Sequence, residues 1–456
     1  MEILPLNQQY TITTSSPGKC LLSGGYLILN PKYGGTVLNT ATYITTTTNF
    51  ISHPHQTMNE YLLITAHSVF YNTTFTFQLT YNTSSNSIEL TNTTNNNNNV
   101  YIYYSIYSAF YFFLTQLHSN EQRSLLITSL IKTNKQIHID IQSDYRFYSY
   151  SPLNTSLTNI KTGLGSSSAL ISSITSSLYL FLEFTCNNKS NINLNKGNII
   201  SLKDNRIRTL ITIASISANN LAQHKIGSSF DIVSSLLGSQ IFYKSKTNLN
   251  ILSNDDFIYN DNTINEINSY INYFDTTYIN NISFLSKLNF PFKLAMISIE
   301  CGSDTKILVK KVTEYAKANM TTDIFDDPLF SQLTLINNEL ITTFTTLSPL
   351  ISHNNLKSLC KQYRNIIQQI TTTTQIDIEP PILTPLLDDL LSQSSIYYAI
   401  CPGAGGYDSI AVVGSGETFL TDMNECITRY SAKTQTKAYV IDVECSFEGT
   451  LFNIKK

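Results

Sequence analysis

Charged residues are scarce in this chain, and their scarcity excludes several kinds of partner. Asp, Glu, Lys and Arg make up 13% of the 456 residues, about half the usual share, so we expect Asn, Ser and Thr to supply much of the polar surface. Lys and Arg (29) nearly balance Asp and Glu (32). No basic stripe could neutralise many phosphates of a nucleic acid, so we expect an anionic partner to be a small molecule.

The chain lacks the paired cysteine spacing that a disulfide scaffold or a zinc site would favour. The seven cysteines are odd in number, widely scattered and never arranged as C-x-x-C, which favours a reduced, cytoplasmic chain. The amino terminus has no basic segment followed by an apolar core, so we expect no secretory signal. The seven histidines form no H-E-x-x-H or other metal-ligand spacing.

Two long uncharged stretches are candidates for membrane spans by length. Residues 100–117 contain five tyrosines together with Ser, Thr and Gln, which favours a core helix over a lipid-exposed one. Residues 162–182 open with Gly-Leu-Gly and contain many serines, which predicts a glycine loop followed by a buried helix. We therefore expect no membrane partner.

Hydrophobic patterning predicts an α+β protein of two domains with a cleft between them. The first domain covers residues 1–245 and the second residues 246–456, with an irregular, Asn- and Asp-rich linker at about 248–289. A turn is expected at residues 15–19. Strands are predicted at residues 10–14, 40–50, 136–141, 292–300, 396–401, 410–413 and 438–443, and within 61–81; helices are predicted at residues 100–117, 202–223, 232–237, 305–318 and 386–391.

The strongest local signal is the glycine loop, Lys161-Thr162-Gly163-Leu164-Gly165-Ser166-Ser167-Ser168-Ala169, which leads directly into an apolar helix. Glycines permit close backbone approach, and the free N–H groups at a helix amino terminus attract an anion such as phosphate. The spacing matches neither a P-loop nor a dinucleotide fingerprint. An ordinary Ser-capped helix after a glycine turn remains the alternative.

Three further segments carry possible chemistry. The lysine segment (residues 16–19, Ser-Pro-Gly-Lys) could aim Lys19 at a phosphoryl group, although a solvated turn lysine has the same pattern. The aspartate segment (residues 225–231) sets Asp231 at the start of a helix, where a plain cap is the alternative. The second glycine segment (residues 402–408, Pro-Gly-Ala-Gly-Gly-Tyr-Asp) is a flexible loop or a hairpin between two strands.

Taken in chain order, the lysine segment, the glycine loop and the second glycine segment resemble the three motifs of the GHMP family of small-molecule kinases. Longer stretches resemble its fungal-type phosphomevalonate kinase branch, notably Asp377-Ile378-Glu379-Pro380-Pro381 and the Gly-Gly-Tyr-Asp string that ends at Asp408. The matching blocks run from about residue 11 to about residue 413. Related enzymes tend to have His and Gly where this chain has Asn219 and His224, and an arginine near Tyr43.

The resemblance implies a ribosomal-S5-like amino-terminal domain, a ferredoxin-like carboxy-terminal domain, and transfer of a phosphoryl group from MgATP to (R)-5-phosphomevalonate. Lys19 and Asp231 would form the catalytic pair, residues 161–169 would bind ATP, and Ser167 (or Ser166) would reach Mg²⁺. The expected acceptor-binding residues are Lys225, Ser228, Ser303, Thr305, Gly403, Ala404 and Gly405. Further cations for the acceptor phosphate could come from Lys161, Arg146 and Lys306.

Two alternatives stay open at this level. A related kinase acting on an alcohol such as mevalonate, homoserine or galactose would need Asp231 as a true base. A catalytically silent relative would bind nucleotide without phosphoryl transfer, although retention of Lys19, Ser167 and Asp231 argues against it. The chain is expected to be a monomer or a homodimer.

Overall fold

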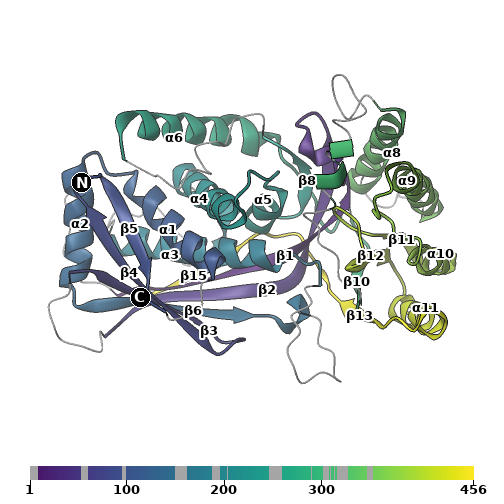
Figure 1. Ribbon diagram of the computed structural model, residues 1–456, viewed down its shortest axis with the longest axis horizontal. Helices are drawn as coiled ribbons and strands as arrows, with labels where there is room; N and C mark the ends of the chain where they lie inside the picture. The colour runs from purple at the N-terminus through teal and green to yellow at the C-terminus, as the bar shows by residue number, and fades with distance from the viewer. Residues whose placement is uncertain are drawn as a thin grey trace.

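The structure is a computed structural model that describes residues 9–52, 60–94, 99–148, 162–186, 196–202, 204–245, 259–288, 290–300, 308, 310–312, 314–315, 327–346 and 353–456. Within these residues the strands form one eleven-stranded sheet and one four-stranded sheet. Figure 1 shows the two sheets in separate halves of an elongated molecule, with β1 and β2 reaching from the larger half towards the smaller one. The α+β class predicted from the sequence is confirmed.

The large sheet has the order β5-β4-β3-β6-β2-β1-β15-β7, with β8, β9 and β14 paired beside this path. Its strands are β1 (Thr11–Ser23), β2 (Gly34–Ser52), β3 (Leu62–Ser68), β4 (Thr73–Asn82), β5 (Ser87–Asn92), β6 (Lys135–Ser143), β7 (Lys196–Asn198), β8 (Gln240–Tyr243), β9 (Ser283–Phe284), β14 (Cys445–Ser446) and β15 (Leu451–Lys455). Residues 40–48 of β2 and most of β3 and β4 alternate between buried and more exposed positions, as the β-branched and aromatic alternation predicts.

The predicted turn at residues 15–19 is wrong, because this segment lies inside β1. The strand continues through Pro17 and Gly18 and pairs with β2, with a register shift between these two residues. A β-bulge of this kind bends a strand and redirects the following side chain. The Pro-Gly pair therefore produces an irregularity within the strand, and Lys19 comes directly after it.

In the described part of the chain, the helices that lie with the large sheet include α1 (Val100–Leu114), α2 (Asn120–Lys132), α3 (Ser166–Cys186), α4 (Asn205–Gln223) and α5 (Phe230–Leu237). Among them α3 packs directly on β1 and β2, and α1 and α4 pack on α3. By length and composition α3 could cross a membrane, but 94% of its apolar window is buried inside the fold. This is the buried helix that the sequence predicts after the glycine loop.

Many Ser and Thr side chains lie in the core instead of on the surface, and paired hydroxyls make this possible. Thr14 Oγ1 donates to the carbonyl oxygen of Ser173 at 2.7 Å, and Thr46 Oγ1 donates to Ser173 Oγ at 2.8 Å. The hydroxyls of Thr48 and Ser177 lie 2.7 Å apart. Burying a hydroxyl is costly unless it is hydrogen-bonded, so these contacts account for a serine-rich helix against a threonine-rich strand.

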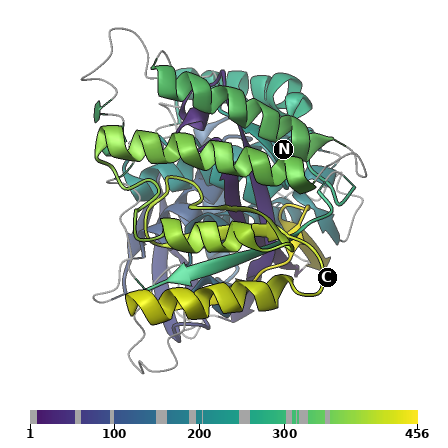
Figure 2. The same ribbon diagram turned by 90° about the vertical axis from the view of Figure 1, so that its right-hand side faces the viewer.

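The small sheet is antiparallel with the order β11-β12-β10-β13. It contains β10 (Lys293–Ile299), β11 (Ile396–Ile400), β12 (Ser409–Gly414) and β13 (Ala438–Asp442); its helices are α8 (Pro328–Thr345), α9 (His353–Thr374), α10 (Thr384–Ser392) and α11 (Phe419–Thr434). Figure 2 shows these helices side by side across its outer face. Helices between the first and second and between the third and fourth strands give the ferredoxin-like arrangement expected.

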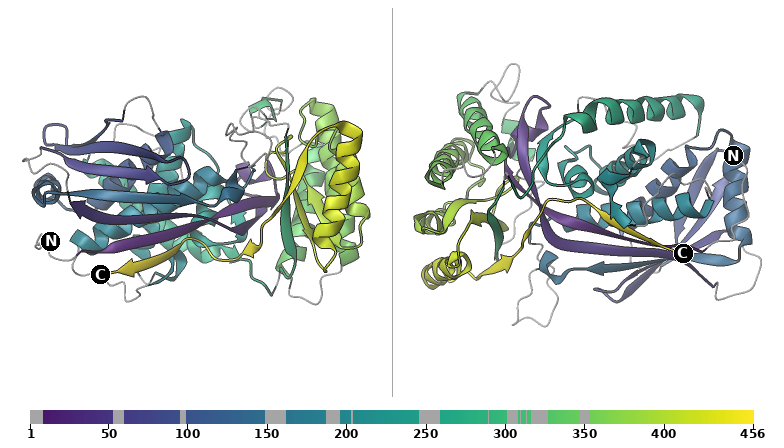
Figure 3. Two further views of the ribbon diagram at one scale, coloured as in Figure 1. Left: turned by 90° about the horizontal axis from the view of Figure 1, so that it is seen from below. Right: turned by 180° about the vertical axis from the view of Figure 1, so that it is seen from behind.

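Residues from the second half of the chain also complete the large sheet. Strand β15 pairs with β1, β14 with β2, and β9 with β8. Figure 3 shows the chain passing from β13 back along the large sheet to its end at β15. The division into domains near residue 245 remains a prediction, and these three strands belong to the sheet of the first half.

The expected irregular linker at about 248–289 is wrong for most of its described part. Residues 261–281 form α6 (Asp261–Tyr273), a π-helical turn (Phe274–Tyr278) and a 3-10 turn (Ile279–Asn281). Asn260 caps α6 by accepting a hydrogen bond from the amide of Thr263. Ile267, Tyr270, Ile271 and Phe274 are buried, and their helical spacing is the signal that the Asn- and Asp-rich composition obscured.

Candidate active site

The four segments singled out in the sequence border one pocket of about 790 Å³. It is lined by Lys19 from β1, residues 162–168 of the glycine loop, residues 225–231 of the aspartate segment, and Pro402–Ala404, Gly405, Asp408 and Ser409 around the second glycine segment. These segments are far apart in sequence, and strands and helices of both sheets bring them together. The size and mixed lining suit a small-molecule site.

Lys19 is fixed against the glycine loop by backbone and side-chain contacts. Its amide donates to the carbonyl oxygen of Leu164 at 2.9 Å. A Cβ placed on Gly165 would lie only 2.7 Å from Lys19 Cε, so the lysine stem crosses directly over this glycine. The ammonium nitrogen lies 4.8 Å from the ring centroid of Phe230, within cation–π range. Lys19 therefore links the glycine loop to the start of α5.

The glycine loop turns sharply before it enters α3. Gly163 and Gly165 have φ values of 76° and 73°, a left-handed conformation that glycine adopts without strain. Thr162 anchors the loop, since its hydroxyl donates to the carbonyl oxygen of Arg146 at 2.9 Å. Helix α3 begins at Ser166, so its first amides, which lack partners within the helix, lie at the pocket. This combination binds phosphate in many proteins.

Asp231 lies in the first turn of α5, and its Oδ1 accepts from the amide of Ile232 at 3.0 Å. The residue before this helix has an unusual conformation. Ser229 has φ 65°, its side chain is 4% exposed, and its hydroxyl has no hydrogen-bond partner in the described part of the chain. A strained residue with an unsatisfied buried hydroxyl in a pocket is typical of a ligand site.

The second glycine segment closes the pocket from the small sheet. Its Gly403 amide donates to the carbonyl oxygen of Leu21 at 3.2 Å, and Tyr26 Oη donates to the carbonyl oxygen of Ala404 at 2.6 Å. A Cβ on Gly25 would overlap the carbonyl oxygen of Gly403. The turn after β1 and the second glycine segment are thus in backbone contact, which requires glycine at the point of closest approach.

A buried ion pair lies behind this segment. Arg364 of α9 donates to both carboxylate oxygens of Glu379, at 2.7 and 3.0 Å, and the two side chains are 4% and 2% exposed. Burial alone would lower the pKa of Arg364, but hydrogen bonds to Glu379 and its negative charge raise it above the usual value. The carbonyl oxygen of the preceding Ile378 accepts from the Gly406 amide at 3.0 Å, so the pair supports the glycine segment.

The structure places most of the sequence-predicted site residues on the pocket, but not all of them. Ala169 is buried in α3, and its amide donates to Gly165 at 3.1 Å, so this amide is unavailable to a phosphate. The guanidinium of Arg146 contacts Asp144 and the carbonyl oxygen of Ala41 and does not line the pocket. The predicted residues that lie outside the described part of the chain are Lys161, Ser303, Thr305 and Lys306.

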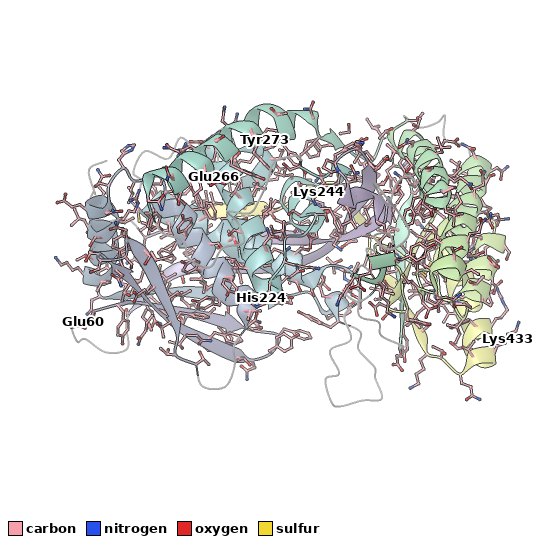
Figure 4. All side chains as sticks on the ribbon, turned by 45° about the horizontal axis from the view of Figure 1, so that its top comes forward. Glu60, His224, Lys244, Glu266, Tyr273 and Lys433 are labelled. Carbon is pink, nitrogen blue, oxygen red and sulfur yellow. The ribbon has the colours of Figure 1, made fainter. Side chains whose placement is uncertain are left out.

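The three residues that differ from those of related enzymes lie in different parts of the structure. Asn219 lines the pocket and accepts from Gln223 Nε2 at 2.7 Å. His224 forms the left-handed end of α4 and is exposed, as Figure 4 shows. The hydroxyl of Tyr43 lies 3.1 Å from Ser446 Oγ, and Tyr43 does not line the pocket. Asn219 is thus the one of these three positions that borders the pocket.

Sequence reasoning did not select several of the pocket residues, and two of them, Lys244 and Ser229, have polar groups that a ligand could contact. Lys244 follows β8 and its ammonium donates to the carbonyl oxygen of Leu29 at 3.5 Å. No motif surrounds it, and only the pairing of β8 with β2 brings it to the pocket. Ser229 lay inside the aspartate segment, but its buried, strained conformation has no sequence signal.

The donors at the pocket fit Mg²⁺ better than a tightly bound transition metal. In the described part of the chain, no group of three or more His, Cys, Asp or Glu side chains could hold a metal ion. Mg²⁺ usually takes one or two protein oxygens and completes its shell with waters and substrate phosphates. Oxygens of this kind are present on Ser166, Ser167 and Asp231.

No family model matches the chain, but individual proteins are similar to it over almost its full length. Phosphomevalonate kinase of Gibberella zeae is 25% identical, covering 96% of both chains. That of Aspergillus fumigatus is 26% identical, covering 95% of this chain and 92% of the relative. The solved Streptococcus pneumoniae phosphomevalonate kinase in complex with phosphomevalonate and AMPPNP has the same fold, with a TM-score of 0.54 and 11% identity, covering 95% of this chain and 99% of that one. The chain therefore shares its fold with that phosphomevalonate kinase and, over almost its full length, is similar to fungal phosphomevalonate kinases.

Proposed function

We propose that the chain transfers the γ-phosphoryl group of ATP to (R)-5-phosphomevalonate, producing (R)-5-diphosphomevalonate and ADP in the mevalonate route to isoprenoids and sterols. The observation that carries this proposal is the convergence of Lys19, the glycine loop and Asp231 on one pocket. The fold by itself does not choose an acceptor, since one fold serves many substrates. The full-length similarity to fungal phosphomevalonate kinases favours this one.

The glycine loop would hold the ATP phosphates. Amides at the start of α3 and the positive end of the helix face the pocket beside Ser166 and Ser167, and both features stabilise anionic oxygens. The ammonium of Lys19 lies next to this loop, where it can neutralise charge on the phosphoryl group as it passes to the acceptor. The catalytic contribution is therefore mainly electrostatic and positional.

Asp231 has a different task with a phosphate acceptor than with an alcohol. A phosphate monoester has a second pKa near 6 and is mostly dianionic at neutral pH, so it needs no base to become a nucleophile. Asp231, at the start of α5, would orient the acceptor and Lys19. Mg²⁺ held by the phosphates and by Ser167 or Asp231 would offset the repulsion between the two anions.

An acceptor panel tests the proposal. ADP release is measured with phosphomevalonate, mevalonate, homoserine and galactose, using the wild type and Asp231→Asn. We expect release with phosphomevalonate alone, and a partial loss in Asp231→Asn because no proton must be removed. Activity with an alcohol, abolished in Asp231→Asn, would instead identify an alcohol kinase with Asp231 as base.

Lys19→Met separates chemistry from binding. We expect kcat to fall about 100- to 1,000-fold, the usual effect of removing one group that stabilises transition-state charge, with a small change in the KM for ATP. Lys32→Met is the matched control, because Lys32 is exposed and does not line the pocket. Equal losses in kcat and ATP affinity would contradict the role given to Lys19. Nucleotide binding without ADP release for any acceptor would favour a catalytically silent relative.

A further inference from the structure

Lys244 is a pocket cation to which neither the motifs nor the proposed reaction gives a role. It follows the last residue of β8, which pairs with the start of β2. Figure 4 shows the labelled Lys244 between the helices of the large sheet and the turn that follows β1. That turn includes Ile28 and Leu29, which also line the pocket. Lys244 thus stands on the pocket wall that this turn forms.

A series of contacts relates Lys244 to the catalytic lysine. The Lys19 stem crosses Gly165, and its ammonium lies 4.8 Å from the ring centroid of Phe230. The ring of Phe230 meets that of Phe242 edge to face, with centroids 6.2 Å apart. Lys244 is two residues beyond Phe242. Lys19 therefore lies between the glycine loop and Phe230, and Lys244 follows the strand whose Phe242 packs on the other ring of this pair.

The charges of the pocket residues can be compared with the charges of the acceptor. In the described part of the chain the charged lining residues are Lys19, Lys225, Lys244, Asp231 and Asp408, three cations and two anions. Phosphomevalonate carries a phosphate of about −2 charge and an ionised carboxylate at opposite ends of its carbon chain. Because Lys19 and the glycine loop serve the reacting phosphate, the carboxylate needs a separate cation, and Lys225 and Lys244 are the lining lysines that remain in the described part of the chain.

We propose that Lys244 binds the carboxylate of the acceptor and so determines the end from which phosphomevalonate is phosphorylated. The inference rests on the proposed function. An ammonium group has three N–H donors, and the long 3.5 Å bond to Leu29 occupies one of them. The apolar wall formed by Ile28 and Leu29 would border the carbon chain between the two anionic ends.

The test measures how Lys244→Met changes the binding of phosphomevalonate and of a ligand that lacks the carboxylate. The probe is 3-hydroxy-3-methylbutyl phosphate, in which a methyl group replaces the carboxymethyl group, measured as a competitor of phosphomevalonate. We expect Lys244→Met to raise the KM for phosphomevalonate about 10- to 100-fold, the range for a lost hydrogen bond to a charged group. The inhibition constant of the probe and the KM for ATP should change less than about twofold, because neither involves the carboxylate.

Lys244→Arg and Lys32→Met are the control variants. Lys244→Arg keeps the charge and should restore much of the acceptor affinity, and Lys32→Met should behave as the wild type. If Lys244→Met weakens the probe as much as phosphomevalonate, or weakens neither, the assignment to the carboxylate is wrong. If the wild type releases no ADP with phosphomevalonate, the proposed function fails and this inference fails with it. If the wild type is active and Lys244→Met leaves the KM for phosphomevalonate unchanged, only the role given to Lys244 is contradicted.

Discussion

Glu379→Ala tests whether the buried ion pair stabilises the fold behind the second glycine segment. The Glu379 carboxylate accepts two hydrogen bonds from Arg364, one from Gln368 at 2.7 Å and one from Thr384 at 3.1 Å. Its side chain is 2% exposed and that of Arg364 is 4% exposed, so solvent screens the pair very little. Removing the carboxylate leaves an uncompensated guanidinium in the interior.

We expect Glu379→Ala to lower the free energy of unfolding by about 3 to 5 kcal/mol, the usual cost of removing one partner from a buried pair. The remaining ion pair of Arg364, with Asp388 at 2.8 Å, involves a carboxylate that is 64% exposed, and it cannot replace Glu379. Urea unfolding followed by far-UV circular dichroism measures the change, since the chain has no tryptophan.

The exposed pair of Arg429 and Asp389 provides the control. Its N–O distance of 2.9 Å is similar, but its side chains are 48% and 31% exposed, so Arg429→Ala should change stability only slightly. A double variant, Arg364→Met with Glu379→Met, removes both charges of the pair. Its free energy of unfolding should fall less than that of Glu379→Ala alone. A loss for Glu379→Ala no larger than that for Arg429→Ala would refute the reasoning.

Three further predictions concern the pocket and its support. Gly405→Ala should destabilise the protein strongly, because its Cβ would overlap the carbonyl oxygen of Ile378. Gly416 also has a positive φ but open space around it, so Gly416→Ala should lower the free energy of unfolding by only about 1 to 2 kcal/mol. Thermal melting compares the two variants, and equal losses of stability would contradict this prediction. Burial raises the pKa of the Cys20 thiol to about 12, so it should remain protonated and unmodified by iodoacetamide at pH 8; rapid alkylation seen by mass spectrometry would disprove this. Ser229→Gly should relieve the backbone strain at φ 65°, so the melting temperature should stay equal or rise. The same variant should raise the KM for a substrate, and an unchanged KM would exclude a ligand contact by the Ser229 hydroxyl.

The sequence identified several residues that line the pocket, but it indicated less about how they are arranged. Lys19, Asp231 and the glycines could be chosen because phosphate chemistry limits which residue types and turns can serve it. Their convergence on one pocket depends on sheet pairing, which local patterns do not encode. Lys244 was missed for that reason, since only the partner strand of β8 brings it to the pocket.

Local errors have equally specific causes. Pro17-Gly18 has the composition of a turn, but pairing with β2 on both sides of the pair holds it in a bulged strand. The Asn- and Asp-rich segment after residue 248 looked irregular, although Asn260 is a helix cap and the buried face of α6 follows it. In this segment the helical spacing of the buried side chains, and not the polar composition, determined the structure.

The position of β15 beside β1 has a consequence for how the protein acquires activity. The hydroxyls of Ser16 and Thr450, 434 positions apart in the chain, lie 2.7 Å from each other, and β15 pairs with residues 11–15 of β1. During synthesis, that side of the strand leading to Lys19 stays uncovered until residues 434 positions later in the chain have been made. Contacts between such distant residues form slowly, and an unpaired strand edge can pair with other chains. A nascent chain is therefore exposed to misassociation until β15 has been made.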